Sequence, residues 1–218
     1  MSELAARLRD LFVAPAGTAP AGPAVAPRVP PSVAVLGRPA DVSAAAPVLA
    51  LALARQRGDA GALVCTWGAP DSASGPRLPA RAAVRRLADR LAAEGLAARA
   101  TGPLALVTLP ADPAAAAAAA VRVAAASPLP VVIALCGART GALDRLLAEQ
   151  DAIAVIAPPR GEGETLARLA CSGLAGLPVP ALTCRLRINR LSRALACAGL
   201  AMPAAARESV APVLEAVS

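Results

Sequence analysis

Lysine, histidine and tyrosine are absent from this chain of 218 residues, and all 22 of its basic residues are arginine. Without histidine the chain has no Ser-His-Asp or Cys-His nucleophile system and no histidine-ligated metal. Without lysine it has no Schiff-base lysine and no phosphate-loop lysine. These absences exclude the commonest hydrolytic and phosphoryl-transfer chemistries before any motif is considered.

The net charge of +7 would ordinarily suggest nucleic acid or an anionic membrane as a partner. Abundant Ala, Arg, Gly and Pro with no Lys indicate a very GC-rich genome, in which arginine takes the surface positions that lysine would share. The charge excess is then ordinary surface charge, and we do not expect nucleic acid as a partner.

Aromatic residues are also scarce, so a core built from Leu, Val, Ile and Ala must pack its helices closely on a sheet. The five cysteines form no CxxC pair, and Cys65 and Cys136 lie in strand-like runs. We interpret them as buried, reduced thiols and expect no metal site. No signal peptide and no membrane span is recognisable, which predicts a soluble cytoplasmic protein.

The stretch from Pro130 to Pro159 carries the clearest fold signal. Two apolar runs rich in β-branched residues, Val131–Cys136 and Ala152–Ala157, flank a segment with apolar residues at helical spacing. Apolar runs without alternation are typical of strands buried on both faces, so the stretch predicts strand–helix–strand in a parallel sheet.

Strand-like and helix-like segments alternate along the rest of the chain. Gly102 and Pro103 divide two apolar runs and predict a hairpin or two short strands, and Asp112 with Pro113 predicts a helix start. Asp41 or Ser43 is expected to cap the helix after the first strand and the loop Arg38-Pro39-Ala40. In the helix predicted for 161–176, the inward positions are Leu166, Leu169, Ala170 and Leu174.

The predicted strands are 32–36, 61–66, 96–101, 104–109, 131–136, 152–157 and 180–186. The predicted helices after the first include 79–94, 112–126, 161–176, 189–198 and 204–217. Residues 32–218 therefore predict an α/β domain, a doubly wound, mostly parallel sheet with helices on both faces.

The N-terminus looks like a separate unit. Residues 1–13 predict an amphipathic helix with an apolar face of Leu4, Leu8, Leu11 and Phe12. Residues 14–31 form a Pro/Ala-rich linker that spans roughly 50 Å if extended as polyproline. We interpret the helix as a docking peptide for a protein partner; the alternative is that it packs on its own domain.

Three segments resemble the MinD/ParA class of deviant P-loop ATPases, most closely the TadZ/CpaE type of Tad pilus systems. They are Ser32–Leu53, Val131–Arg139 in the place of the Walker B strand, and Asp151–Pro159. The last, DAIAVIAPP, is similar to the class's aD-x-v-x-v-v-x-P strand. The resemblance covers residues 32–200 and implies a SIMIBI/MinD-like three-layer sandwich.

The catalytic groups of that class are missing. Its KGGxGK[ST] phosphate loop is here GRPADVSA, which has no lysine and in which Pro39 removes an amide donor. Its second strand ends in an Asp that handles the attacking water, whereas this one ends in Cys65-Thr66-Trp67. No acid stands at Ala134–Gly137 in the place of the Walker B Asp. We therefore predict a pseudo-ATPase that is not an enzyme and uses no cofactor.

An anion site is predicted only from topology. In a doubly wound sheet, the loops after the first and fifth strands meet at a switch point beyond the carboxyl ends. Gly37, Arg38, Asp41, Arg139 and Arg160 are the candidates for such a site. The alternative is that these arginines are solvated loop residues of an arginine-rich protein.

Two functions stay open. One is a catalytically inactive scaffold that binds a protein partner, in Tad-type pilus assembly, secretion or positioning. The other is a binder of a small anionic ligand or nucleotide in the cleft, or an enzyme of an unfamiliar pattern. We favour the scaffold and expect a monomer or weak homodimer, because arginines facing their symmetry mates would repel.

Overall fold

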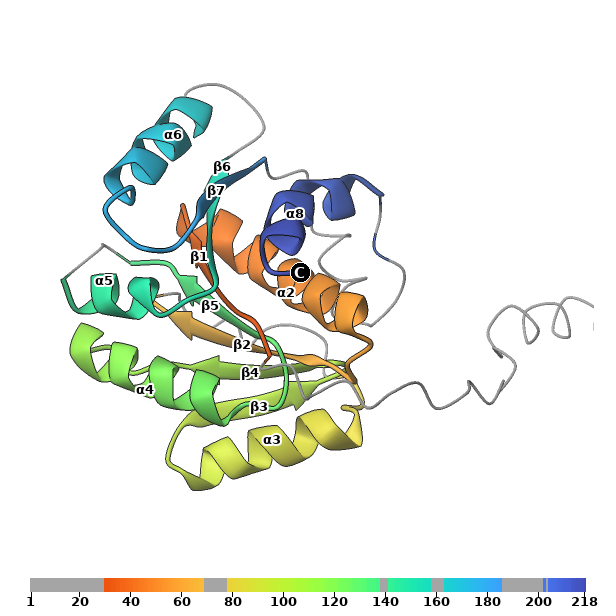
Figure 1. Ribbon diagram of the computed structural model, residues 1–218. Helices are drawn as coiled ribbons and strands as arrows, with labels where there is room; N and C mark the ends of the chain where they lie inside the picture. The colour runs from red at the N-terminus through yellow and green to blue at the C-terminus, as the bar shows by residue number, and fades with distance from the viewer. Residues whose placement is uncertain (1–29, 69–77, 138–140, 158–162, 186–201, 203) are drawn as a thin grey trace, which may run out of the picture.

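Figure 1 shows the computed structural model, which describes residues 30–68, 78–137, 141–157, 163–185, 202 and 204–218. The predicted N-terminal helix, the linker up to residue 29 and the helix predicted for 189–198 lie outside these ranges. In chain order the elements are β1 (Ser32–Leu36), α2 (Pro39–Arg57), β2 (Ala62–Trp67), α3 (Ala82–Ala93), β3 (Ala97–Thr101), β4 (Leu104–Thr108), α4 (Pro113–Ala126), β5 (Val131–Leu135), α5 (Gly141–Ala148), β6 (Ala152–Ala157), α6 (Gly163–Gly173), β7 (Ala181–Arg185) and α8 (Ala204–Ala216).

Seven strands form one sheet in the order β3-β4-β2-β5-β1-β6-β7. Every neighbouring pair is parallel except β3 and β4, which form the predicted antiparallel hairpin around Gly102. The strand–helix–strand stretch places β5 and β6 on either side of β1. The predicted doubly wound, mostly parallel α/β fold is therefore confirmed.

Helices cover both faces of the sheet, with α2 and α8 on one face and α3, α4, α5 and α6 on the other (Figure 1). Side chains alternate between the faces along each strand. In β5, Val132 and Ala134 pack under α2, while Val131 and Ile133 pack on the opposite side. Because both faces are covered, the central strands such as β5 and β6 are continuous apolar runs rather than alternating ones. No helix within the described ranges is long and apolar enough to cross a membrane.

The start of α2 differs from the prediction. The helix begins at Pro39, and Arg38 is its extended N-cap residue without a side-chain cap bond. Proline suits the first helical position because its fixed φ is already helical and no intrahelical N–H is needed there. The predictions of a loop through Ala40 and of a helix cap at Asp41 or Ser43 were therefore wrong, because the helix already begins at Pro39. At α4 the predicted start is confirmed, since the Asp112 carboxylate accepts a 2.7 Å bond from Ala115 N.

The inward face predicted for α6 is also partly wrong. Leu169 is 64% exposed and Ala170 is exposed, whereas Ala167 and Leu174 are buried. The helix packs against β6 and β7 at one end of the sheet. A helix at the margin of a sheet therefore buries fewer positions than its apolar spacing suggests.

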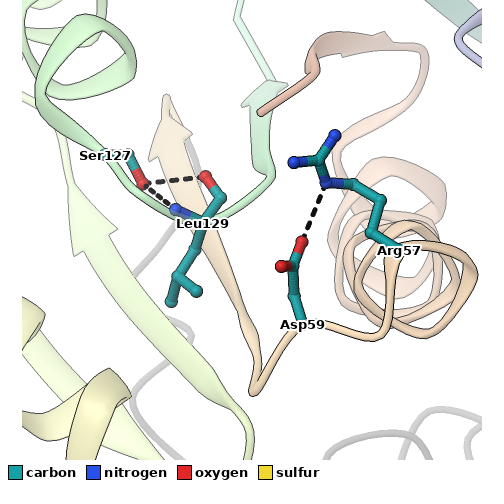
Figure 2. A network of polar contacts seen from close by, with 4 residues as sticks. All are labelled: Arg57, Asp59, Ser127 and Leu129. Carbon is teal, nitrogen blue, oxygen red and sulfur yellow. Dashed lines mark hydrogen bonds and ion pairs between the residues drawn. The ribbon is translucent and has the colours of Figure 1, made fainter. Parts of the chain in front are cut away.

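Polar turns hold the amino ends of the strands (Figure 2). Before β2, Arg57 Nε lies 2.9 Å from Asp59 Oδ2. Before β5, Ser127 Oγ donates to Leu129 O at 2.8 Å and accepts from Leu129 N at 3.1 Å. These contacts stabilise turns at the amino edge of the sheet. In folds of this kind ligands bind at the opposite, carboxyl edge.

Candidate functional site

The carboxyl ends of β1 and β5 lie side by side, with Leu36 opposite Leu135. The chain leaves β1 toward α2 on one face and leaves β5 toward α5 on the other. This divergence is the predicted switch point, where an α/β sheet opens a crevice for a ligand. Gly37 stands at this point with φ +152°, and an added Cβ would lie 3.1 Å from Ile156 O. A side chain at this position would be strained, because L-residues rarely adopt this φ and the added Cβ would be in tight contact with β6.

Two of the predicted anion-site residues are engaged with each other. Arg38 Nε lies 2.6 Å from Asp41 Oδ2, and this bond and the charge of Asp41 raise the pKa of Arg38. The Arg38 side chain is 69% exposed, whereas that of Asp41 is only 15% exposed. An incoming anion would therefore find Arg38 already paired with the Asp41 carboxylate.

The amino end of α2 is poorly suited to phosphate. Pro39 removes one of the N–H groups that a helix start offers to an anion. The N–H groups of Asp41 and Val42 both donate to Arg38 O, each at 2.9 Å. The Asp41 carboxylate lies in the first turn, where it neutralises the positive end of the helix dipole. A bound phosphate would have to compete with this internal anion.

The carboxyl end of β2 is closed by the only tryptophan of the chain. Trp67 is buried, and its Nε1 donates to Ala111 O at 3.2 Å. Its ring lies directly over Gly137, where an added Cβ would come within 2.3 Å of Trp67 Cζ3. An aromatic ring thus fills the edge between β2 and β5. In the sequence, Trp67 is recognisable only as part of a strand end that lacks the Asp of the related ATPases. No local pattern predicts that its ring closes this edge.

Cys136, the residue after β5, lies against the start of α2. Its Sγ is 3.9 Å from Pro39 O. Burial raises the pKa of the Cys136 thiol, and a hydrogen bond with Ser43 only partly opposes this. A buried thiol with a raised pKa stays protonated near neutral pH, so Cys136 is not an activated nucleophile. Its contacts are those of a packing residue.

The other predicted site residues lie outside the described ranges. This applies to Arg139, Arg160 and the apolar face of the N-terminal helix, Leu4, Leu8, Leu11 and Phe12. The structure therefore brings together Gly37, Arg38 and Asp41, and the meeting of three arginines stays a prediction. Within the residues that the structure describes, no three His, Cys, Asp or Glu side chains lie close enough to hold a metal ion.

No family model matches the chain, and no curated protein matches it. Among solved structures, it is similar to the crystal structure of a ParA family ATPase from Chlorobium tepidum TLS. The two share 14% sequence identity, the match covers 80% of this chain and 82% of that chain, and the TM-score is 0.47. A likeness of this degree identifies neither an activity nor a site.

Proposed function

We propose that the chain is a catalytically inactive, MinD/ParA-like scaffold that binds a protein partner, in Tad-type pilus assembly, secretion or positioning. The observation that supports inactivity is the Arg38–Asp41 pair at the start of α2, 2.6 Å between Nε and Oδ2. The Asp41 carboxylate therefore lies at the start of α2, the position that a bound phosphate would have to occupy. The MinD/ParA likeness rests on the sequence segments described above.

Phosphoryl transfer depends on positioning and on neutralising charge at the phosphates. The usual means are backbone N–H groups, a lysine and carboxylates that hold Mg²⁺. Here Pro39 starts the helix, lysine is absent, β2 ends in Trp67, and β5 is followed by Cys136-Gly137. With these groups a nucleotide has neither its cradle nor its metal ligands, so we expect no turnover.

The partner contact that we propose is the N-terminal helix, through Leu4, Leu8, Leu11 and Phe12. A long proline-rich linker lets such a helix reach a partner without moving the domain.

The test of inactivity is a phosphate-release assay on the purified full chain with Mg²⁺ and ATP or GTP. We expect no release above a blank. Turnover that survives further purification and disappears in Arg38→Ala would contradict the proposal. A fluorescent ATP analogue that binds the wild type and Arg122→Ala, but not Arg38→Ala, would favour the anionic-ligand alternative. Arg122 is an exposed arginine of α4 and serves as the matched control.

A further inference from the structure

The chain enters the sheet through two prolines and a serine. Pro30 and Pro31 come directly before β1 and have no N–H group, so the first N–H that the strand can use belongs to Ser32. A residue that precedes proline is held in an extended conformation, which applies here to Pro30. The segment N-terminal to β1 is therefore attached to the domain through a stiff, extended connection.

The first residue of β1 is bonded through both of its main-chain groups to Asp151. Ser32 N donates to Asp151 Oδ2 at 2.7 Å, and Ser32 O accepts from Asp151 N at 2.9 Å. β6 itself begins one residue later, at Ala152, so a side-chain carboxylate takes the place of a main-chain acceptor at this point. A hydrogen bond to a carboxylate is charge-assisted and stronger than one between neutral groups. The amino end of the strand is thus closed by a strong acceptor.

A buried glutamine connects the same serine to helix α5. Ser32 Oγ donates to Gln150 Oε1, and Gln150 Nε2 donates to Leu146 O at 2.7 Å. The Gln150 side chain is fixed in this position, because the residue is only 6% exposed. On the other side of β1, Pro31 O accepts a 2.9 Å bond from Val131 N, the first residue of β5. The entry into β1 is therefore bonded to β5, to the start of β6 and to α5 at once.

The strand that begins here is a central one. β1 lies between β5 and β6 and pairs in parallel with both along almost its whole length. The hydrogen bonds of a parallel pair are evenly spaced along the strand. A pull along the axis of β1 therefore strains all of these bonds together instead of breaking them one after another. At the other end of the chain, α8 is held by packing on α2 and β7 rather than by two ladders.

We propose that the amino end of β1 is a mechanical anchor, in which Ser32, Gln150 and Asp151 keep the domain folded when a partner pulls on the N-terminal segment. The inference rests on the proposed function, in which the partner binds residues 1–13. Because the chain is continuous, a force on those residues reaches the domain through Pro30 and Pro31. Forced unfolding is governed by the rate of unfolding rather than by equilibrium stability, so bonds at the point of attachment have a large effect.

The test is degradation of the full chain by an ATP-driven unfoldase–protease, which pulls on a peptide tag fused to either terminus. Asp151→Ala removes the carboxylate from Ser32 N and should speed degradation from an N-terminal tag about fivefold, the effect of one hydrogen bond. Degradation from a C-terminal tag should change little, because that pull removes α8 first. Each variant is compared with the wild type that carries the same tag, so that recognition of the tag cancels. Equal acceleration from both tags would overturn the proposal, since the carboxylate would then contribute only to global stability.

Two further variants separate the anchor from its surroundings. Ser32→Ala removes the bond to Gln150 but keeps the main chain, and it should also speed degradation from the N-terminal tag alone. The matched control is Asp59→Ala, which removes a carboxylate from the same edge of the sheet, 2.9 Å from Arg57 Nε before β2. It should affect degradation from the two tags alike. An effect of Asp59→Ala as large as that of Asp151→Ala, and likewise confined to the N-terminal tag, would contradict a specific anchor.

Amide hydrogen exchange on the wild-type full chain decides the question even if Asp151→Ala does not fold. Strand ends ordinarily fray, whereas an anchored end stays closed. The amide of Ser32 should therefore exchange as slowly as that of Ala34 in the middle of β1. Exchange of Ser32 at the rate of an open chain would contradict the anchor. Neither assay contains nucleotide or partner, so their failure leaves the scaffold proposal standing, whereas phosphate release contradicts only the scaffold.

Discussion

Gly137 is a position where a single methyl group should have a large effect, because the Trp67 ring lies against it. An added Cβ would approach Trp67 Cζ3 to 2.3 Å, so Gly137→Ala must displace the ring or the backbone. We expect the free energy of unfolding to fall by about 1–3 kcal/mol, as for other overpacked sites. Urea unfolding followed by the fluorescence of Trp67 measures this directly, since it is the only tryptophan.

The matched control is Gly141→Ala, at the exposed first residue of α5. An added Cβ there has nothing within 4 Å. We expect no loss of stability and no change in the fluorescence of the folded state. Equal effects of the two substitutions would mean that Trp67 does not close the carboxyl edge in solution.

The buried thiols predict how stability depends on pH. Burial raises the pKa of Cys65 to about 12, and that of Cys184 to about 12 with a contribution from Cys171. Above the ordinary thiol pKa of about 8.5 the unfolded chain loses these protons while the folded chain keeps them. The free energy of unfolding should therefore be flat below about pH 8 and fall as pH rises, by about 1.4 kcal/mol per pH unit for each thiol.

The measurement is urea unfolding with a reducing agent at pH values from about 8 to 11. Lysine and tyrosine are absent, so few other groups titrate in this range. Cys65→Ala should make the fall with pH less steep. Val64→Ala, in the same strand, should lower stability at every pH and leave the slope as it is. An unchanged slope in Cys65→Ala would show that this thiol ionises as readily in the folded state.

At the scale of elements, Arg90 connects two helices of the same face. Its Nη2 donates to Ala126 O, the last residue of α4, at 2.8 Å. Carbonyls at a helix carboxyl end have no intrahelical partner, and a cation there also interacts favourably with the helix dipole. Arg90→Ala should therefore lower the free energy of unfolding by about 1 kcal/mol.

Arg86→Ala is the control for this change. Arg86 is an exposed arginine of the same helix α3, so its loss alters charge and helix propensity in the same way. Its effect should stay within about 0.5 kcal/mol, as for other surface substitutions. Equal losses in the two variants, measured by urea unfolding, would mean that the Arg90 bond does not stabilise the junction of α3 and α4.

At the scale of the whole molecule, the N-terminal unit should be separable from the domain. Removing residues 1–29 is the appropriate deletion, because Pro31 O accepts a 2.9 Å bond from Val131 N and belongs to the ladder of β5. We expect the thermal midpoint, followed by circular dichroism, to stay nearly unchanged while partner binding is lost. A drop of many degrees would show that Leu4, Leu8, Leu11 and Phe12 pack on their own domain.

The sequence by itself determined the order and kind of the elements that the structure describes. Apolar runs such as Val131–Leu135 and Ala152–Ala157 appear as strands because residues buried on both sides must all be apolar. The hairpin around Gly102 and the start of α4 at Asp112 are likewise local, set by turn and cap chemistry within a few residues. The absence of lysine and of acids at the strand ends was also plain from the sequence.

Only the tertiary structure decided what depends on residues far apart in the chain. Strand order placed β1 between β5 and β6 and left β7 at an edge, and no local pattern specifies such long-range pairing. The same holds for the Trp67 ring over Gly137, which are 70 positions apart, and for the exposure of Leu169 on a helix with ordinary apolar spacing. Hydrophobic periodicity reports which face of an element is apolar, but the neighbours that pack against that face are set by the whole chain.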